Sequence, residues 1–451
     1  MEPLQTGRSA SRSSNIGSTN RQYSRRETTR PVIAATVGCM LEWYDFAIYG
    51  YFAVVISRLF FPNHDEVVSL LLSVATFGVG FAMRPIGALV FGTLADRQGR
   101  RVALSWTVIT MVLGTFLMVI TPTYSSAGIV APIIVVIARL IQGFSAGGEM
   151  GSALSYLVEY APRQRKFLFA SFQQLTQLLA LLIGSLVGAA VNGLMPVETV
   201  ETWGWRVPFM LGLIIAPVGW YIRNRTEEPP AFAEILKQRR AGKNTDHALG
   251  APSPWSTLRD HPRETLGGFF ITILWTVSTY FFLVFMPTYA VKQLHISASH
   301  SLVSNSLSLL VAVVATPCFA LLADRHGPLK LLRMGAMAIT ILVYPALSVL
   351  LEYQSFEALL VVQATLAVAI ASFTGPAGGA LASLFPDGNR SIGVSIAYNF
   401  AVTLFGGFAP FISTWLIQTS GNSLAPAFYV VFAGLAAMAG CSLASPKLCK
   451  A

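Results

Sequence analysis

The sequence predicts an all-α membrane protein with twelve transmembrane helices arranged as two six-helix bundles. Hydrophobic residues make up 54% of the 451-residue chain and charged residues only 12%, about half the share that is usual in soluble domains. The apolar residues fall into segments of about 20 residues or more, the length at which a helix crosses a bilayer. A charged sequence pattern in the first half also recurs in the second half.

The expected spans form two groups of six, separated by a polar segment. The first group is expected at residues 32–58, 68–95, 102–121, 128–158, 167–192 and 205–222, and the second at 265–290, 300–323, 331–351, 355–384, 391–418 and 424–444. An N-terminal tail rich in Ser, Thr and Arg should be disordered because it has few apolar groups to bury. The predicted units are the tail 1–30, a bundle 31–222, a linker 223–264, a bundle 265–444 and a short tail 445–451.

The basic residues are distributed unevenly between the two sides of the membrane. The chain has a net charge of +10, and its 31 Lys and Arg residues lie in the tails, the linker and one alternating set of loops, except for Arg58, Arg206, Lys292, Arg84 and Arg139. Cytoplasmic loops carry such an excess of Lys and Arg, so both termini are expected in the cytoplasm. No basic face remains once the spans are removed, and nucleic-acid binding is therefore not expected.

Other chemistries have little support in the sequence. The four cysteines are scattered and indicate no disulfide framework, and the six histidines fall in predicted loops without a second ligand at metal spacing. Gly242-Lys243 is followed by Asn244, so the phosphate-binding pattern of ATP-driven pumps is missing. We therefore expect neither an enzyme nor a bound cofactor.

The repeat indicates how the two bundles are related. Leu94-Ala-Asp-Arg97 follows the second span, and Leu322-Ala-Asp-Arg325 follows the eighth. Because each half has an even number of spans, the copies keep the same orientation, with an axis along the membrane normal and a ligand site between them at mid-depth. This duplication is typical of an alternating-access transporter and is not needed by a receptor or an anchored enzyme.

The first copy of the repeat is the most specific motif in the chain. Gly92-Thr-Leu-Ala-Asp-Arg-Gln-Gly-Arg-Arg101 fits the pattern Gly-x-x-x-Asp-Arg-x-Gly-Arg-Arg, and here the chain resembles the major facilitator superfamily. A tight turn permitted by glycine leaves the Asp free to accept from a neighbouring helix N-terminus. The second copy is degenerate, so a cytoplasmic latch should depend mainly on the first; the alternative is merely a basic loop. The predicted gating residues are Gly92, Asp96, Arg97, Gly99, Arg100, Arg101, Asp324 and Arg325.

Two acids lie within the first predicted span. Glu42 and Asp45 are three residues apart in Leu41-Glu-Trp-Tyr-Asp-Phe46 and share one face of a helix. A charged side chain at bilayer depth costs about 2.5–3.5 kcal/mol on insertion scales. Two acids on one face therefore indicate proton coupling, although a packing role beside a neighbouring helix is the alternative.

Two arginines and an acid occupy other spans. In the fourth span Arg139, Gln142 and Glu149 lie on one side of the helix, and a buried Arg requires a carboxylate, for which the two acids of the first span are the expected partners. We expect proton coupling by Asp45, Glu42, Arg139 and Glu149, with Asp45 as the carrier switched by Arg139; a structural ion pair is the alternative. Arg84 in the second span is expected to clamp a substrate anion, unless it snorkels to the membrane surface.

Polar and aromatic side chains in other spans complete the expected cavity. The expected substrate-binding residues are Arg84, Arg139, Gln142, Gln173, Gln177, Trp275, Tyr280, Asn305 and Asn399. Each amide could instead serve as a hydrogen-bonding contact between helices. Two cationic groups in an otherwise neutral cavity favour an anionic substrate.

A narrower resemblance rests on several motifs together. Together they resemble the metabolite:proton symporter family of bacteria, whose members take up citrate, 2-oxoglutarate, shikimate or betaine and proline. The motifs are Glu42-Trp-Tyr-Asp-Phe46, Arg84-Pro-Ile-Gly87, Gly143-Phe-Ser-Ala-Gly-Gly-Glu149, and Tyr398-Asn399 with Phe405-Gly-Gly407. The resemblance implies a proton symporter of the bacterial inner membrane, with protons as the coupling ion. We expect uptake of a small organic acid such as a di- or tricarboxylate by a monomer in the bilayer. The alternatives are uptake of a zwitterionic osmolyte, proton-coupled efflux, and a receptor that binds without transport.

Overall fold

The computed structural model describes residues 39–98, 100–224, 254–386 and 389–449, without the side chains of 95–97, 100–101, 149, 163, 215–216 and 218–224. The predicted tail 1–30 and most of the predicted linker lie outside the described residues. So do Gly99 and the side chains of Asp96, Arg97, Arg100, Arg101 and Glu149.

The described chain is helical and contains no strand. Ten of its helices are long and apolar enough to cross a membrane, or eleven if a bent pair, Cys39–Tyr51 with α2 (Ala53–Phe60), counts as one span. Helix α11 (Arg206–Asn224) packs along α5 and is the twelfth segment. The predicted all-α fold with twelve spans is confirmed.

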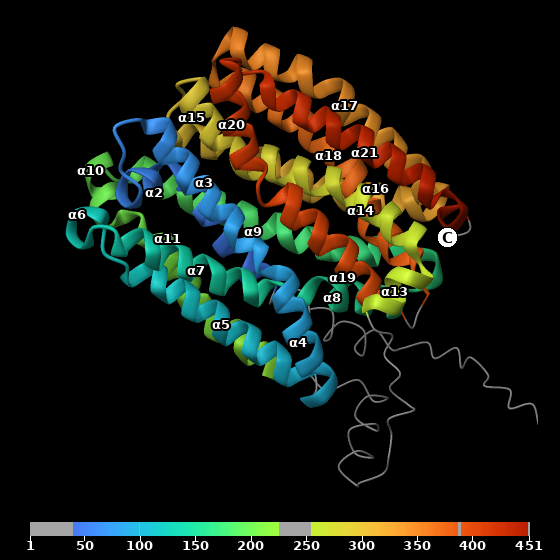
Figure 1. Ribbon diagram of the computed structural model, residues 1–451. Helices are drawn as coiled ribbons and strands as arrows, with labels where there is room; N and C mark the ends of the chain where they lie inside the picture. Colours follow the sequence, from blue (N-terminus) through green and yellow to red (C-terminus); the bar gives the residue numbers. More distant parts are fainter. Residues whose placement is uncertain (1–38, 99, 225–253, 387–388, 450–451) are drawn as a thin grey trace, which may run out of the picture.

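Each half contains six of these segments (Figure 1). In the first half they are Cys39–Tyr51 with α2, α3 (Glu66–Ala82) with α4 (Arg84–Gln98), α5 (Arg100–Ile120), α7 (Val130–Ala146) with α8 (Glu149–Glu159), α9 (Lys166–Leu194), and α11. In the second half they are α14 (Pro262–Thr279) with η3 (Tyr280–Phe285) and α15 (Met286–Gln293), α16 (Ala298–His326), α17 (Pro328–Tyr353), α18 (Phe356–Leu384), α19 (Arg390–Ala401) with η4 (Val402–Gly406) and α20 (Ala409–Ser420), and α21 (Ala425–Leu448). Short helices α6 (Tyr124–Ala127), η1 (Arg163–Arg165), α10 (Val197–Thr199), η2 (Val200–Gly204) and α13 (Pro254–Asp260) occupy the connections.

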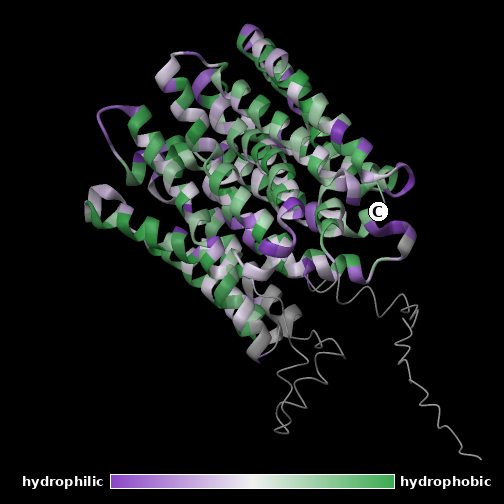
Figure 2. Cartoon of the chain, turned by 45° about the vertical axis from the view of Figure 1, so that its right-hand side comes forward, coloured by the Kyte–Doolittle hydropathy of each residue, from purple (hydrophilic) through white to green (hydrophobic). Residues whose placement is uncertain are grey.

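The outer faces of the long helices are apolar. Hydrophobic residues run along the helices in Figure 2, whereas the hydrophilic ones gather mainly in the connections at their ends. Leu89, Ile120, Ile214, Ile341 and Val361 are each more than half exposed. Soluble monomers rarely expose apolar patches of more than a few hundred Å², so this surface is suited to lipid.

The two halves meet where α9 packs on α16 and α18, where α8 packs on α19 and where α3 packs on α20. At one end the carboxylate of Asp324 on α16 accepts hydrogen bonds from the backbone N–H groups of Phe167 (2.8 Å) and Leu168 (3.1 Å) on α9. At the other end Lys292 on α15 binds Glu66 on α3 at 2.7 Å. In this structure the two halves are therefore bonded to each other at both ends of the molecule. We call these the Asp324 end and the Lys292 end.

The repeated motif takes part in one of these bridges through its second copy. Asp324 satisfies two N–H groups at the start of α9, where the helix dipole favours a negative charge. In the first copy, Gly92 lies inside α4 with open space where a Cβ would be, and Gly99, the other glycine of the motif, lies outside the described residues, so the expected turn is not tested. Whether the latch depends mainly on the first copy stays a prediction.

Candidate functional site

Four ionisable side chains gather in the interior of the first half. Glu42 and Asp45 come from the helix Cys39–Tyr51, Arg84 from α4 and Arg139 from α7. Their exposed fractions are 6%, 4%, 2% and 0%, respectively. Charged groups are almost never buried this deeply unless they are paired, so the contacts of each one decide its role.

Glycines bring the helices that carry the two arginines together. A Cβ on Gly143 of α7 would meet the backbone of Gly80 on α3, and a Cβ on Gly147 would meet the carbonyl of Arg84. Only residues without a Cβ permit such close approach of two backbones. The glycine-rich segment of the fourth span therefore packs closely against α3 and α4, and the guanidinium groups of Arg84 and Arg139 both lie over the ring of Phe46, 5.4 Å and 4.4 Å from its centre.

Arg84 forms a direct ion pair with Glu42. The Arg84 Nη2 donates to Glu42 Oε1 at 2.6 Å, and its guanidinium lies 4.9 Å from the ring centre of Phe81 and 5.3 Å from that of Trp43. The sequence suggested Glu42 as a partner of Arg139, whereas the structure pairs it with Arg84. Because Arg84 turns inward to this pair, it does not snorkel.

Arg139 reaches Asp45 only through two neutral side chains. Arg139 Nη1 donates to Gln142 Oε1 (2.7 Å), and Gln142 Nε2 donates to Thr115 Oγ1 (3.1 Å). Thr115 Oγ1 in turn donates to Asp45 Oδ2. We call Arg139, Gln142, Thr115 and Asp45 the relay. The expected direct pair between Arg139 and Asp45 is absent from the described contacts, and the relay takes its place.

Thr115 was not among the predicted site residues. A threonine in an apolar helix usually bonds the carbonyl one turn earlier, and Thr115 also lies 3.1 Å from the Met111 carbonyl. Nothing in the sequence distinguishes it from Thr110, which bonds the carbonyls of Trp106 and Thr107 in the same helix. Only the tertiary contact with Asp45 identifies it.

Many buried polar atoms in the interior have no hydrogen-bond partner among the described residues. They include Asp45 Oδ1, Arg84 Nε, Arg139 Nε and Nη2, both amide atoms of Gln173, Gln177 Oε1, Tyr280 Oη and Asn399 Oδ1. Leaving one such atom unsatisfied costs about 1–3 kcal/mol. The set includes donors and acceptors from both halves, which is what a site for a polar ligand or water requires.

The other predicted binding residues divide into two groups. Gln173, Gln177, Trp275, Tyr280 and Asn399 are buried in the centre, where Trp275 donates to Gln174 (2.8 Å) and Asn399 donates to the Gly147 carbonyl (3.3 Å). Gln174 is a further site residue that the sequence did not single out.

Asn305 belongs to a different contact. Its Nδ2 donates to Tyr51 Oη (3.1 Å), Ser185 Oγ (3.2 Å) and the Leu283 carbonyl (3.3 Å). The bonds to Tyr51 and Ser185 join α16 to the first half, and the bond to Leu283 joins it to η3 of its own half, so the structure favours the alternative interpretation of Asn305 as an interhelical contact. Among the described residues no three His, Cys, Asp or Glu side chains form a group that could hold a metal.

Comparisons with known proteins place the chain in a family. Residues 35–350 and 269–446 match the family described as Major Facilitator Superfamily. The chain is 35% identical to the citrate-proton symporter of Klebsiella pneumoniae, over 90% of the chain and 89% of that protein. It is 30% identical to the proline/betaine transporter of Escherichia coli strain K12, over 89% of the chain and 80% of that protein.

A solved structure shows the same fold. The xylose transporter XylE from E. coli, in a partially occluded inward-open conformation, superposes with a TM-score of 0.74 at 19% identity, covering 91% of this chain and 96% of that one. The twelve helices in two halves of six agree with this fold. The chain belongs to the Major Facilitator Superfamily, in the branch that includes these citrate-proton symporters and proline/betaine transporters.

Proposed function

We propose that this protein imports a small organic acid, such as a di- or tricarboxylate, together with protons by alternating access. The observation that carries the proposal is the pair of buried arginines, whose Arg84 Nε and Arg139 Nε and Nη2 have no partner among the described residues. Guanidinium groups bind carboxylates through paired N–H donors. Two of them in one interior are suited to a substrate with more than one carboxylate.

The charges of the site explain how a proton assists an anion. With Glu42, Asp45, Arg84 and Arg139 all ionised, these four side chains sum to zero charge. Protonation of Asp45 leaves a net charge of +1, and a substrate carboxylate then restores neutrality. Because an uncompensated charge in a low-dielectric interior is costly, proton and anion binding favour each other.

The relay lets Arg139 respond to the protonation of Asp45. When Asp45 is ionised, the Thr115 hydroxyl donates to its Oδ2, and the Met111 carbonyl lies 3.1 Å away as a second acceptor. A protonated Asp45 donates to Thr115 instead, and the hydroxyl then turns to Met111. Arg139 loses the nearby negative charge and offers its free nitrogen atoms to the substrate.

A second candidate function is symport of a zwitterion such as betaine or proline. The interior holds aromatic rings that could bind a quaternary ammonium, since Tyr280 lies 5.8 Å from Trp43 and 5.2 Å from Phe81, measured between ring centres. Arg84 already occupies the ring faces of Trp43 and Phe81, which favours the organic acid.

We propose that the protein lies in a bacterial inner membrane with the Asp324 end and both termini in the cytoplasm. The distribution of Lys and Arg along the sequence supports this orientation. One chain contains both halves of the site, so a monomer is sufficient for transport. Protons are the coupling ion, and no cofactor has a role in the proposal.

Uptake into proteoliposomes tests the function. The purified protein is reconstituted with a pH gradient, acidic outside, and radiolabelled citrate, 2-oxoglutarate, shikimate and betaine are offered in turn. We expect accumulation of a carboxylate above its external concentration, abolished by a protonophore. Accumulation that a protonophore leaves unchanged contradicts proton coupling, and accumulation of betaine alone supports the second candidate. Counterflow without a gradient separates a transporter from a receptor.

A further inference from the structure

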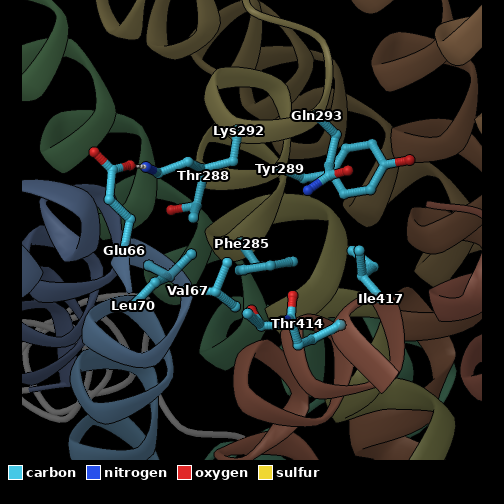
Figure 3. A pocket seen from close by; sticks show the side chains of 11 residues that line it. Glu66, Val67, Leu70, Phe285, Thr288, Tyr289, Lys292, Gln293, Thr414 and Ile417 are labelled. Carbon is cyan, nitrogen blue, oxygen red and sulfur yellow. Dashed lines mark hydrogen bonds and ion pairs between the residues drawn. The ribbon is translucent and has the colours of Figure 1, made fainter. Parts of the chain in front are cut away.

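A pocket lies between the two halves at the Lys292 end. It has a volume of about 180 Å³ and is lined by Glu66 and Leu70 of α3, by Thr288, Lys292 and Gln293 of α15, and by Gln418 of α20 (Figure 3). This pocket is separate from the buried arginines, since neither Arg84 nor Arg139 lines it.

Lys292 forms an ion pair with Glu66 in this pocket, but another carboxylate can readily replace Glu66. Its ammonium lies 2.7 Å from the carboxylate of Glu66, and the side chains are 24% and 71% exposed, respectively. Exposed ion pairs contribute little net stability, because water and salt screen the charges and two long side chains must be ordered. A second carboxylate in the pocket therefore competes with Glu66 on nearly equal terms.

The other basic side chains at this end are engaged elsewhere. Arg58 binds Glu201 within the first half at 3.1 Å. Arg206 donates to the backbone carbonyls of Val119, Thr121 and Thr202. Of the three Lys and Arg residues that the sequence places at this end, all of them described by the structure, only Lys292 lines the pocket.

Neighbouring groups complete a site for a small anion. The Gln293 Oε1 accepts from Ser423 Oγ at 2.7 Å, which fixes the amide, and Thr288 adds a hydroxyl to the wall. Phe285 lines the same pocket and ends the π-helical segment η3, which begins at Tyr280 beside Trp43 and Phe81. The segment η3 thus connects the pocket with the interior around Tyr280 and Trp43, and π-helical segments frequently occur at functional sites.

We propose that this pocket is an outer subsite for the carboxylate of the transported acid, which replaces Glu66 as the partner of Lys292. Loss of the bond between Lys292 and Glu66 then frees the two halves to separate at this end. The inference rests on the proposed function, both for the organic acid and for the placing of this end outside the cytoplasm.

Substitutions of the two partners of the ion pair distinguish a substrate-binding site from a simple latch between the halves. Glu66→Gln removes the competing carboxylate, whereas Lys292→Gln removes the cation that the substrate needs. We expect the half-saturating concentration for citrate uptake to fall about two- to threefold in Glu66→Gln and to rise at least threefold in Lys292→Gln, since exposed pairs have small net strengths. A latch alone predicts shifts in the same direction, because both changes break the same bond.

Matched variants control for general effects of charge. Glu201→Gln removes an ion pair at the same end that lies within one half, and should leave the half-saturating concentration unchanged. Lys292→Arg keeps the cation and should stay near the wild-type value. If Lys292→Gln fails to fold, Lys292→Met, which keeps the apolar stem, replaces it.

Transport by the wild-type protein shows whether a negative result contradicts the outer subsite alone or the proposed function as well. If it transports citrate but both variants shift the half-saturating concentration in the same direction, or neither shifts it, the outer subsite is overturned and the proposed function stands. If the wild-type protein transports no carboxylate in the panel, both the proposed function and the outer subsite are contradicted.

Discussion

The relay makes a quantitative prediction for Thr115→Val. Valine keeps the shape of threonine but has no hydroxyl, so Asp45 Oδ2 loses its donor and Gln142 Nε2 loses its acceptor. A hydrogen bond to a charged group contributes about 1.5–3 kcal/mol. Because Thr115 donates to the ionised carboxylate, its removal disfavours that form relative to the protonated one.

This change should appear in the pH dependence of transport. A difference of 1.36 kcal/mol between protonation states corresponds to one pH unit, so the external pH for half-maximal accumulation should rise by about 1–2 units. Thr115→Ser restores a hydroxyl and should return the profile close to that of the wild type. Initial rates in proteoliposomes, measured at fixed pH gradient between pH 5 and 9, give both values.

Two results would refute the relay. One is a Thr115→Val profile that matches the wild type within 0.3 pH unit, roughly 0.4 kcal/mol. The other is a loss of activity that Thr115→Ser does not restore, which indicates a packing role. Thr110→Val is the matched control, because among the described residues that hydroxyl bonds only carbonyls of its own helix.

Four further predictions concern the buried charged residues and the contact between the halves. Asp45→Asn mimics the protonated acid and should abolish accumulation against a gradient while substrate exchange persists, as measured by counterflow. Glu42→Gln leaves Arg84 buried without its carboxylate and should destabilise the protein by about 3–5 kcal/mol, seen as a lower melting temperature in detergent. Arg84→Lys keeps the charge but loses the paired donors, so substrate affinity should fall about tenfold, and unchanged binding would assign Arg84 to packing. Asp324→Asn weakens the bond between the halves and should change turnover more than affinity, a split that separate binding and transport assays resolve.

The architecture could be predicted because membrane insertion imposes a strong pattern on the sequence. Each span must satisfy its backbone internally and face lipid with apolar side chains, which leaves long apolar segments that composition reveals. The repeat around Asp96 and Asp324 then indicates two similarly oriented halves. Individual buried charges such as Arg139 were equally visible, because their cost in a bilayer requires a function or a partner.

The pairing of those charges could not be predicted, because it depends on which helices lie side by side. Spacing places Glu42 and Asp45 on one face, but it does not say which arginine faces which acid. The close approach of α3, α4 and α7 at their glycines helps to set where the two arginines lie, and spacing along the sequence does not give this tertiary contact. The contributions of Thr115 and Gln174 were missed for a related reason, since neutral side chains of ordinary type become significant only through their tertiary partners.

The observed pairing also distinguishes the two acids chemically. Protonating Glu42 removes the carboxylate from Arg84 at 2.6 Å and leaves a buried cation without its partner, which costs about 3–5 kcal/mol when a buried pair is broken. Protonating Asp45 breaks no direct ion pair, because its described hydrogen bond comes from a hydroxyl that can reverse direction between Asp45 and Met111. Glu42 is therefore suited to hold Arg84 in place until a substrate carboxylate takes over, and Asp45 is suited to gain and lose a proton in each transport cycle.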